Sequence, residues 1–263
     1  MQKLQLLDQM GRRVVLEQTP ERIVCLNPSQ TETLVDLGLE ERIVGVTKFC
    51  VHPSHLRKAK TVVGGTKKVD FDKIRKLNPD IVLCNKEENT QEIVETLEKE
   101  YPVHVTDVSN LQDALEMLQH YGQLFNCSQE TEELSSKIHS EKEQFDKLMR
   151  VQAKKKVAYF IWQKPYMVAG KDTYINHMLE INGFENVFAN QNRYPTTTLE
   201  ELSQLSLDLI LLSSEPFPFK ETHQKKLQEE LGVKVKLVDG EYFSWYGSRL
   251  LGAFQYFRSL HGH

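Results

Sequence analysis

A thiol and an imidazole stand two positions apart in the segment TKFCVHP, Thr47–Pro53, which follows the apolar run RIVGV. Cys50 and His52 could face one metal ion, because alternate residues of an extended chain point to the same side. A zinc site needs about four ligands, and no spacing ties a further donor to this pair. The other donors considered are Glu87, Glu88, Glu215, His223 and Glu241.

A catalytic role for this pair would need a third, orienting group and an oxyanion hole, and neither is visible in the sequence. We therefore interpret the segment first as a pocket rim at which Cys50 and His52 meet a ligand. Two alternatives remain open: His52 coordinates a metal carried by the ligand, since neutral imidazole suits cobalt and iron, or the segment is only structural.

The size and composition of the chain are those of an ordinary soluble globular protein. Its 263 residues are enough for two lobes with separate cores. The net charge is -4 without a basic block, which argues against nucleic acid as a partner. The longest apolar runs, such as LILL at 209–212, are too short to span a membrane. We expect a monomer.

The first residues and the cysteines suggest a cytoplasmic protein. No continuous apolar stretch of roughly 7–15 residues follows Met1, as a secretory leader would require. The four cysteines form no CxxC pair, and Cys25 and Cys84 end apolar runs typical of buried strands. The alternative is a periplasmic or membrane-associated protein whose leader was removed.

Strand-like and helix-like segments alternate along most of the chain, which predicts an α/β fold with parallel sheets. Ser29 is expected to cap a helix that ends at Gly38, because Glu32 completes a capping box. Residues 128–153 lack Gly and Pro and carry an apolar stripe that includes Leu134, Ile138 and Phe145. This predicts a helix of about 39 Å. Lys154–Lys156 are interpreted as its solvated end.

A weak internal repeat supports two similar lobes. FDKIRKLNPDIVLCN resembles LEELSQLSLDLILLS, so that Asp72 and Glu200 each precede an aspartate by eight residues. We predict an N-terminal lobe over 1–127, a linking helix over 128–153 and a C-terminal lobe over 154–263; a long surface helix on a single domain is the alternative. Ligands of such lobes bind beyond the carboxyl ends of the strands, so a pocket between the lobes is expected.

Aromatic side chains gather in the loops that follow the predicted strands, which suits a large flat or amphipathic ligand. Arg249 lies in the last of these loops and could pair with an anionic ligand group, or serve only as a cap or surface charge. The Gly-containing turns VGGT and AGKD match no nucleotide-binding pattern. The loop aromatics are Phe49, Trp162, Tyr166, Phe217, Phe219, Tyr242, Phe243, Trp245 and Tyr246.

Four segments together resemble the helical-backbone metal-receptor family, the substrate-binding proteins of ABC transporters for vitamin B12, ferric siderophores and haem. They are PERIVCLNPSQTETLVDLGLEERIVGVTKFCVHP, KIRKLNPDIVLCN, GKDTYINHMLEINGFENVF and EYFSWYGSRLL, and the resemblance covers nearly the whole chain. It implies two Rossmann-like lobes joined by one long helix, in agreement with the pattern of elements.

Within that family the B12-binding branch is most similar. By loop position, the resemblance implies a ligand site that includes Phe49, His52 and Asn85 in one lobe and Tyr194, Glu241, Tyr242 and Trp245 in the other. It also implies that Asp72 and Glu200 dock onto basic pockets of a membrane permease, where charge complementarity gives orientation.

We therefore expect a non-enzymatic protein that binds a metal-containing cofactor or chelate and requires no cofactor of its own. A corrinoid such as cobalamin is the first choice of ligand, and a ferric siderophore or haem is the second. A cytosolic carrier or sensor on the same scaffold, or a metal-dependent enzyme that uses Cys50 and His52, is the alternative.

Overall fold

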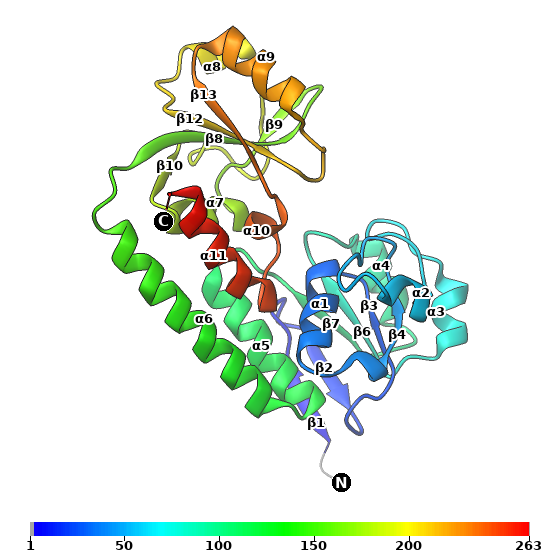
Figure 1. Ribbon diagram of the computed structural model, residues 1–263. Helices are drawn as coiled ribbons and strands as arrows, with labels where there is room; N and C mark the ends of the chain where they lie inside the picture. The colour runs from blue at the N-terminus through cyan, green and yellow to red at the C-terminus, as the bar shows by residue number, and fades with distance from the viewer. Residues whose placement is uncertain (1–2, 263) are drawn as a thin grey trace. The chain divides into compact units, whose positions relative to one another are not determined.

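A computed structural model describes residues 3–262, so Met1, on which the expected location partly rested, lies outside the described residues. The chain forms two compact units (Figure 1). Unit 1 comprises the residues up to Ile138 together with Tyr246–Arg249, and unit 2 comprises His139–Trp245 together with the residues from Leu250 onward. The helix α6 (Ser128–Met149) carries the chain from unit 1 into unit 2.

Unit 1 contains a five-stranded parallel sheet in the order β5-β4-β3-β6-β7. Most of its strands are short, mainly apolar runs buried on both faces, as expected of parallel sheets covered by helices. A separate antiparallel hairpin precedes the sheet, in which Leu4 pairs with Leu16. The strands of unit 1 are β1 (Leu4–Leu7), β2 (Arg13–Leu16), β3 (Ile23–Cys25), β4 (Ile43–Val46), β5 (Thr61–Val62), β6 (Ile81–Asn85) and β7 (Val103–Thr106).

Helices cover both faces of this sheet. Ile74 and Ile93 place α3 and α4 against one face, whereas Tyr121 of α5 contacts His104 and Gln30 on the other. The helices of unit 1 are α1 (Pro28–Asp36), α2 (Leu56–Ala59), α3 (Phe71–Leu77), α4 (Gln91–Leu97) and α5 (Leu111–Phe125), with the 3₁₀ turns η1 (Glu40–Arg42) and η2 (Gly247–Arg249).

Unit 2 contains a second sheet in the order β11-β9-β8-β12-β13, with β10 paired to the start of β8. The central pairs β8·β12 and β12·β13 are parallel, and β9 is antiparallel to β8. Its elements are β8 (Lys155–Trp162), β9 (Tyr166–Val168), α7 (Tyr174–Ile181), β10 (Phe184–Asn186), β11 (Thr196–Thr197), α8 (Leu199–Ser203), β12 (Leu209–Ser213), α9 (Glu221–Leu231), β13 (Lys234–Val238), α10 (Glu241–Ser244) and α11 (Leu250–Leu260).

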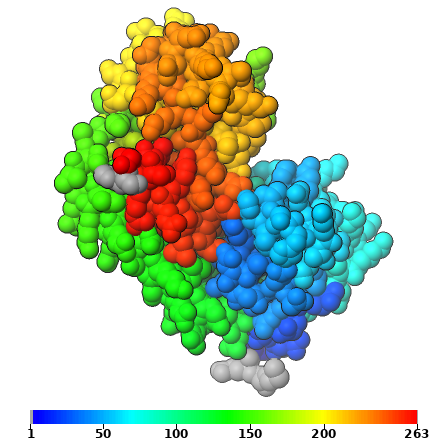
Figure 2. Space-filling model, viewed as in Figure 1, coloured from blue at the N-terminus to red at the C-terminus, as the bar shows by residue number. Residues whose placement is uncertain are grey.

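The unit 2 sheet lies between two helical layers. Leu202 of α8 and Leu227 of α9 pack on one face with Phe160 and Ile210, while α7, α10 and α11 lie on the other (Figure 1). The part of α6 that belongs to unit 2 packs beside α11, as Figure 2 shows in green and red. Phe145 anchors this contact, with its ring centroid 5.9 Å from that of Phe254.

The predicted α/β class, parallel sheets and long helix are confirmed, with changes at the helix ends. α1 begins two residues earlier than predicted, because Pro28 occupies the first turn and Asn27 is the N-cap, its side chain accepting from Gln30 N; Ser29 lies inside the helix. α6 ends at Met149, and Lys155 already belongs to β8 rather than to a helix end. Among the described residues, no helix is long and apolar enough to cross a membrane.

Candidate functional site

The carboxyl ends of β3, β4, β5 and β6 share one edge of the unit 1 sheet. Because β3 lies between β4 and β6, the chain departs in opposite directions along the sheet at this point, which is where α/β folds bind ligands. Asn89 ties the loops together here: its Nδ2 donates to Leu26 O (3.2 Å) and Thr66 O (2.9 Å), and its Oδ1 accepts from Asn85 N (2.8 Å). No pattern in the sequence indicates this role of Asn89.

A groove of about 620 Å³ opens at this edge beside Phe49, whose side chain is 47% exposed. The ammonium group of Lys48 lies 5.0 Å from the centre of the Phe49 ring. The groove offers an aromatic face surrounded by positive charge, a surface suited to an amphipathic ligand with anionic groups. Its charged lining residues are Lys48, Lys67, Lys68, Asp70 and Lys73.

The turn at Gly64 shapes this groove. Gly64 has φ +129, and a Cβ there would lie 2.6 Å from Lys68 O. Only glycine therefore allows the chain to fold back so closely, in an antiparallel bridge with Val69. The Gly-containing turn was recognisable in the sequence, whereas the role of the lysines was not predicted, although two of them follow the turn directly.

Cys50 differs from its sequence-based prediction as a ligand residue. The loop is not extended at this point, since Cys50 N donates to Thr47 O (3.1 Å) and Val51 N to Phe49 O (2.8 Å), so Cys50 and His52 need not share a direction. The Cys50 thiol is fully buried and bonds to Thr31 Oγ1 (3.2 Å). Burial raises the pKa of this thiol, with opposing hydrogen bonds from Thr31 and Thr47. Cys50 is thus a protonated core thiol.

His52 is half-buried and lies close enough to Glu32 to influence the pKa of its carboxyl group. Burial raises the pKa of Glu32, while Arg249 and, more weakly, His52 lower it. Arg249 forms a bidentate pair with Glu32, with Nε to Oε2 at 2.8 Å and Nη2 to Oε1 at 2.6 Å. The guanidinium has a protein carboxylate as its partner, which neither interpretation of Arg249 from the sequence anticipated.

Asn85 also has protein partners for its side chain. Its Nδ2 donates to Thr106 Oγ1 (3.1 Å), and its Oδ1 accepts from Glu87 N and Glu88 N, both at 3.0 Å. Asn85 is 3% exposed. It therefore shapes the turn at the end of β6, and a direct contact with a ligand stays a prediction.

The carboxyl group of Glu88 is partly buried in unit 1, which disfavours its ionised form. Burial raises its pKa, against the attraction of Lys67 and a hydrogen bond from Thr66, and Glu87 raises it further. A perturbed carboxyl at the ligand-binding edge of a sheet is typical of functional sites. Glu88 was considered in the sequence only as a distant metal donor.

We expect Glu88→Gln to stabilise the protein at pH 7. A carboxyl whose pKa is raised by folding destabilises the folded state wherever it is ionised, above the folded pKa, and contributes nothing below the unfolded pKa of about 4.3. The gain in melting temperature should therefore vanish as the pH falls to about 4. Thermal melts at both pH values test this, with exposed Glu92→Gln as the control; a less stable Glu88→Gln protein at pH 7 would contradict it.

The segment Tyr246–Arg249 completes the helical face of unit 1. Gln30 Nε2 donates to Thr106 Oγ1 (2.6 Å) and to Tyr246 Oη (3.1 Å), and Ser248 N donates to Thr33 Oγ1 (3.2 Å). After it the chain leaves unit 1: η2 packs on α1, and α11 starts at Leu250 in unit 2.

The carboxyl edge of the unit 2 sheet carries an aromatic cluster in which Trp162 is exposed. Trp162, at the end of β8, is 40% exposed, and its ring meets Phe217 edge-on at 5.6 Å. Phe217 contacts Phe219 at 4.8 Å. Tyr166 packs against Phe160 at 5.5 Å and is half-buried. Trp162 is thus held by an aromatic contact with Phe217 while a large part of its side chain stays exposed.

The remaining predicted ligand residues of unit 2 are more deeply packed. Trp245 is 8% exposed and donates its indole N–H to Glu215 Oε1 (3.1 Å). Tyr242 stacks on Tyr256 at 4.8 Å. Tyr194, with the Arg193 guanidinium 5.8 Å from its ring, is half-buried, as is Glu241. Their contacts with a ligand stay predictions.

Asp72 and Glu200 occupy the same position in corresponding helices. Each is the second residue of a short helix, α3 or α8, whose N-cap side chain accepts from the third N–H. Both are exposed. Asp72 also pairs with Arg75 at 3.0 Å. The sequence repeat thus corresponds to a structural equivalence, while docking through these residues stays a prediction.

No group of three or more His, Cys, Asp or Glu side chains within residues 3–262 is arranged to hold a metal ion. Coordination by His52 of a metal carried by the ligand stays a prediction.

The profile of the family described as periplasmic binding protein matches residues 23–234. The vitamin B12-binding protein of Pectobacterium atrosepticum is 26% identical over 246 residues, which cover 90% of this chain and 86% of that protein. An uncharacterized ABC transporter substrate-binding lipoprotein, YvrC of Bacillus subtilis, is 25% identical over 78% of this chain and 67% of that protein.

Among solved structures, a possible iron-binding (periplasmic solute-binding) protein from Staphylococcus epidermidis superimposes with a TM-score of 0.79 at 21% identity. The match covers 94% of this chain and all of that chain. At this identity it shows the fold, which agrees with the α/β architecture described above.

Proposed function

Because this chain belongs to the periplasmic binding protein family, we propose that it binds a metal-containing cofactor or chelate for an ABC-type uptake system. The observation that carries the proposal is the family match over residues 23–234. The proteins of this family that resemble the chain are solute-binding proteins rather than enzymes. Uptake by such a system implies a small-molecule ligand and a permease as partners.

A corrinoid is our first candidate ligand. The relative named as a vitamin B12-binding protein matches 90% of the chain. Phe49 in unit 1 and Trp162 in unit 2 are exposed aromatic side chains at the carboxyl edges of their sheets. Such faces can stack on a large, flat macrocycle, which gains affinity from the apolar area that it buries.

An anionic iron chelate or haem is the second candidate. The observation that favours it is the positive charge of the groove beside Phe49. Its charged lining residues are four lysines, Lys48, Lys67, Lys68 and Lys73, and one aspartate, Asp70. Carboxylates or phenolates of a chelate would make charge-assisted hydrogen bonds with these ammonium groups.

The aromatic and the charged parts of the groove distinguish the two ligands. We expect Phe49→Ala to weaken binding of the true ligand about tenfold or more, because an exposed aromatic anchor carries about 1–3 kcal/mol. Lys67→Gln/Lys73→Gln should weaken an anionic chelate strongly and a corrinoid little. Equilibrium dialysis measures both, with exposed Leu7→Ala as the control; equal affinities for Phe49→Ala and the native protein would exclude the groove as the site.

His52 is proposed as an axial donor to the metal of the ligand. Its imidazole would replace a weaker ligand of cobalt or iron and shift the visible absorption of the bound cofactor. A His52→Ala protein that binds the ligand with an unchanged spectrum would remove this role.

We also propose that Asp72 and Glu200 dock the protein onto its permease. Reversing both charges, in Asp72→Lys/Glu200→Lys, should reduce uptake by cells at least tenfold, since like charges at an interface cost several kcal/mol. Ligand affinity should not change. Glu92→Lys is the matched control, because Glu92 is exposed at the same position of α4. Uptake that survives the double reversal would rule out this docking mode.

The comparisons give no support to the cytoplasmic location expected from the sequence, since the family is described as periplasmic and YvrC as a lipoprotein. We propose that the protein works outside the cytoplasm or at the membrane surface. Fractionation of the cells that produce it tests this, and recovery solely with cytoplasmic markers would contradict it.

A further inference from the structure

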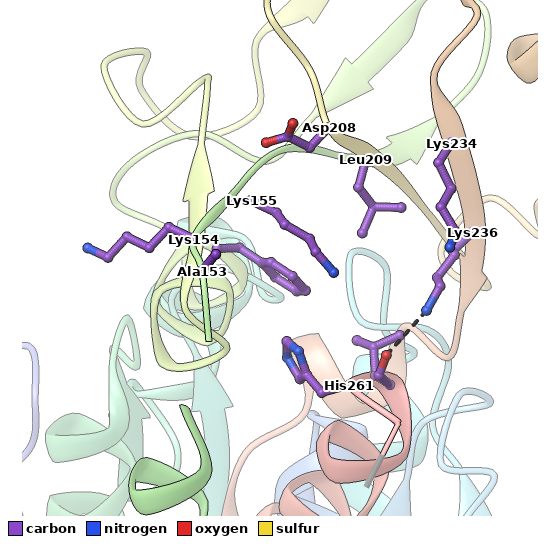
Figure 3. Close-up of a pocket in the computed structure, with 10 residues that line it drawn as sticks. Ala153, Lys154, Lys155, Asp208, Leu209, Lys234, Lys236 and His261 are labelled. Carbon is purple, nitrogen blue, oxygen red and sulfur yellow. Dashed lines mark hydrogen bonds between the residues drawn. The ribbon is translucent and has the colours of Figure 1, made fainter. Parts of the chain in front are cut away.

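Besides the groove of unit 1, the structure has a pocket in unit 2. It lies at the edge of the unit 2 sheet opposite to Trp162. Lys155, Leu209 and Lys234 are the first residues of β8, β12 and β13, so the pocket lies at the amino ends of these strands (Figure 3). Its volume is about 400 Å³. Ligands of α/β sheets usually bind at the carboxyl edge, so the proposed uptake function leaves this pocket without a role.

The lining of this pocket is strongly basic in a chain whose net charge is -4. Four lysines line it, namely Lys154, Lys155, Lys234 and Lys236, against a single aspartate. Figure 3 shows Lys155, Lys234 and Lys236 converging on the pocket from two strands, whereas Lys154 points away. The aspartate, Asp208, is already engaged, because its Oδ2 accepts from Lys156 N (2.7 Å).

Carboxylates in the described part of the chain leave the three convergent lysines without an ion pair. Within residues 3–262, no carboxylate forms an ion pair of 4.0 Å or less with Lys155, Lys234 or Lys236. Lys236 Nζ donates to Leu260 O at 3.2 Å, which leaves it two further N–H donors. Burial lowers the pKa of Lys236, and the charges of Lys234 and Lys155 lower it further.

Buried apolar side chains and one histidine ring also line the pocket. Leu209 is 4% exposed and Phe184 is 6% exposed. The His261 ring stacks on Phe184 at 5.2 Å, and its Nε2 lies 3.2 Å from Asn182 Oδ1. A buried apolar floor strengthens the interaction between an ammonium group and an anion above it, because less water screens them.

From this geometry we propose that the pocket binds a phosphate-bearing polyanion, held by Lys155, Lys234 and Lys236. Three ammonium groups directed to one space match the several oxygens of such a group, and lysine is a common phosphate ligand. A bound polyanion would also relieve the repulsion among the three lysines and so stabilise the folded protein. The proposal is independent of the ligand taken up.

The test is calorimetric titration of the full chain with sodium tripolyphosphate, at low salt and at 150 mM salt. We expect saturable binding of one anion per chain and a rise in melting temperature. Lys155→Gln/Lys234→Gln should weaken the affinity at least tenfold. The charge-matched control, Lys225→Gln/Lys226→Gln on α9, should bind as the native protein does, since these exposed lysines lie outside the pocket.

A second measurement identifies the source of the phosphate. Co-sedimentation with phosphatidylglycerol vesicles that depends on Lys155 and Lys234 would support a lipid headgroup; binding of tripolyphosphate without vesicle binding would support a free polyanion. Absence of saturable tripolyphosphate binding, or an equal loss in the pocket variant and the α9 control, would overturn the proposal.

Discussion

Replacement of Gly247 by alanine should destabilise the protein by roughly 2–5 kcal/mol. Gly247 has φ +82, a region in which a Cβ costs about 1–2 kcal/mol. A Cβ there would also lie 2.0 Å from Thr33 Oγ1, and overpacking of this kind costs about 1–3 kcal/mol. Thr33 cannot easily move, because its Oγ1 donates to Ser29 O (2.9 Å) and accepts from Ser248 N.

Urea unfolding of Gly247→Ala measures this loss, and Gly232→Ala separates its two causes. Gly232 has φ +65 but no atom within 4 Å of an added Cβ, so only the conformational cost of about 1 kcal/mol should remain. If the two variants lose equal stability, the predicted steric clash between residue 247 and Thr33 does not occur, which would contradict the close packing of η2 on α1.

Removal of Glu32 should have the next largest effect. Glu32→Ala leaves the Arg249 guanidinium, whose side chain is 11% exposed, without its bidentate carboxylate partner. Loss of one member of a buried pair costs about 3 kcal/mol, since the other charge stays desolvated. The pKa of Glu32 is raised, which means that burial disfavours its ionised form more than the attraction of Arg249 favours it.

We expect Glu32→Met/Arg249→Met to be nearly as stable as the native protein, because apolar groups of similar volume carry no desolvation cost. Chemical denaturation of the single and double variants measures the difference. The exposed pair of Lys3 and Glu17 is the control, and Glu17→Ala should cost less than about 1 kcal/mol. A loss in Glu32→Ala no greater than in Glu17→Ala would show that the pair is effectively solvated.

Much of the fold was predictable because its strands and helices are encoded locally. Runs such as IVLCN and LILL are short, apolar and bounded by turn residues, which identifies buried parallel strands. Leu134, Ile138 and Phe145 are spaced so that they share one face of a helix, and all three side chains are buried as predicted. The repeat around Asp72 and Glu200 likewise survived as equivalent helix positions.

The site was less predictable because its details depend on contacts between distant residues. Cys50 was expected to face the ligand, but a local turn, invisible in the sequence, directs its thiol toward Thr31. The partner of Arg249 is 217 residues away in the chain, at Glu32. The lysines of the unit 2 pocket come from the starts of different strands, so no sequence motif joins them.

The most direct test of metal-cofactor binding is a titration of the purified chain with cobalamin, haemin and a ferric siderophore, each beside its metal-free counterpart. Tryptophan fluorescence and the visible spectrum of the ligand are followed together. We predict that one of the three ligands binds saturably at micromolar concentration or below, one per chain, and quenches Trp162, the more exposed tryptophan; Trp162→Phe should remove most of the quenching. Absence of saturable binding by all three ligands, with the protein folded, would contradict the proposed function.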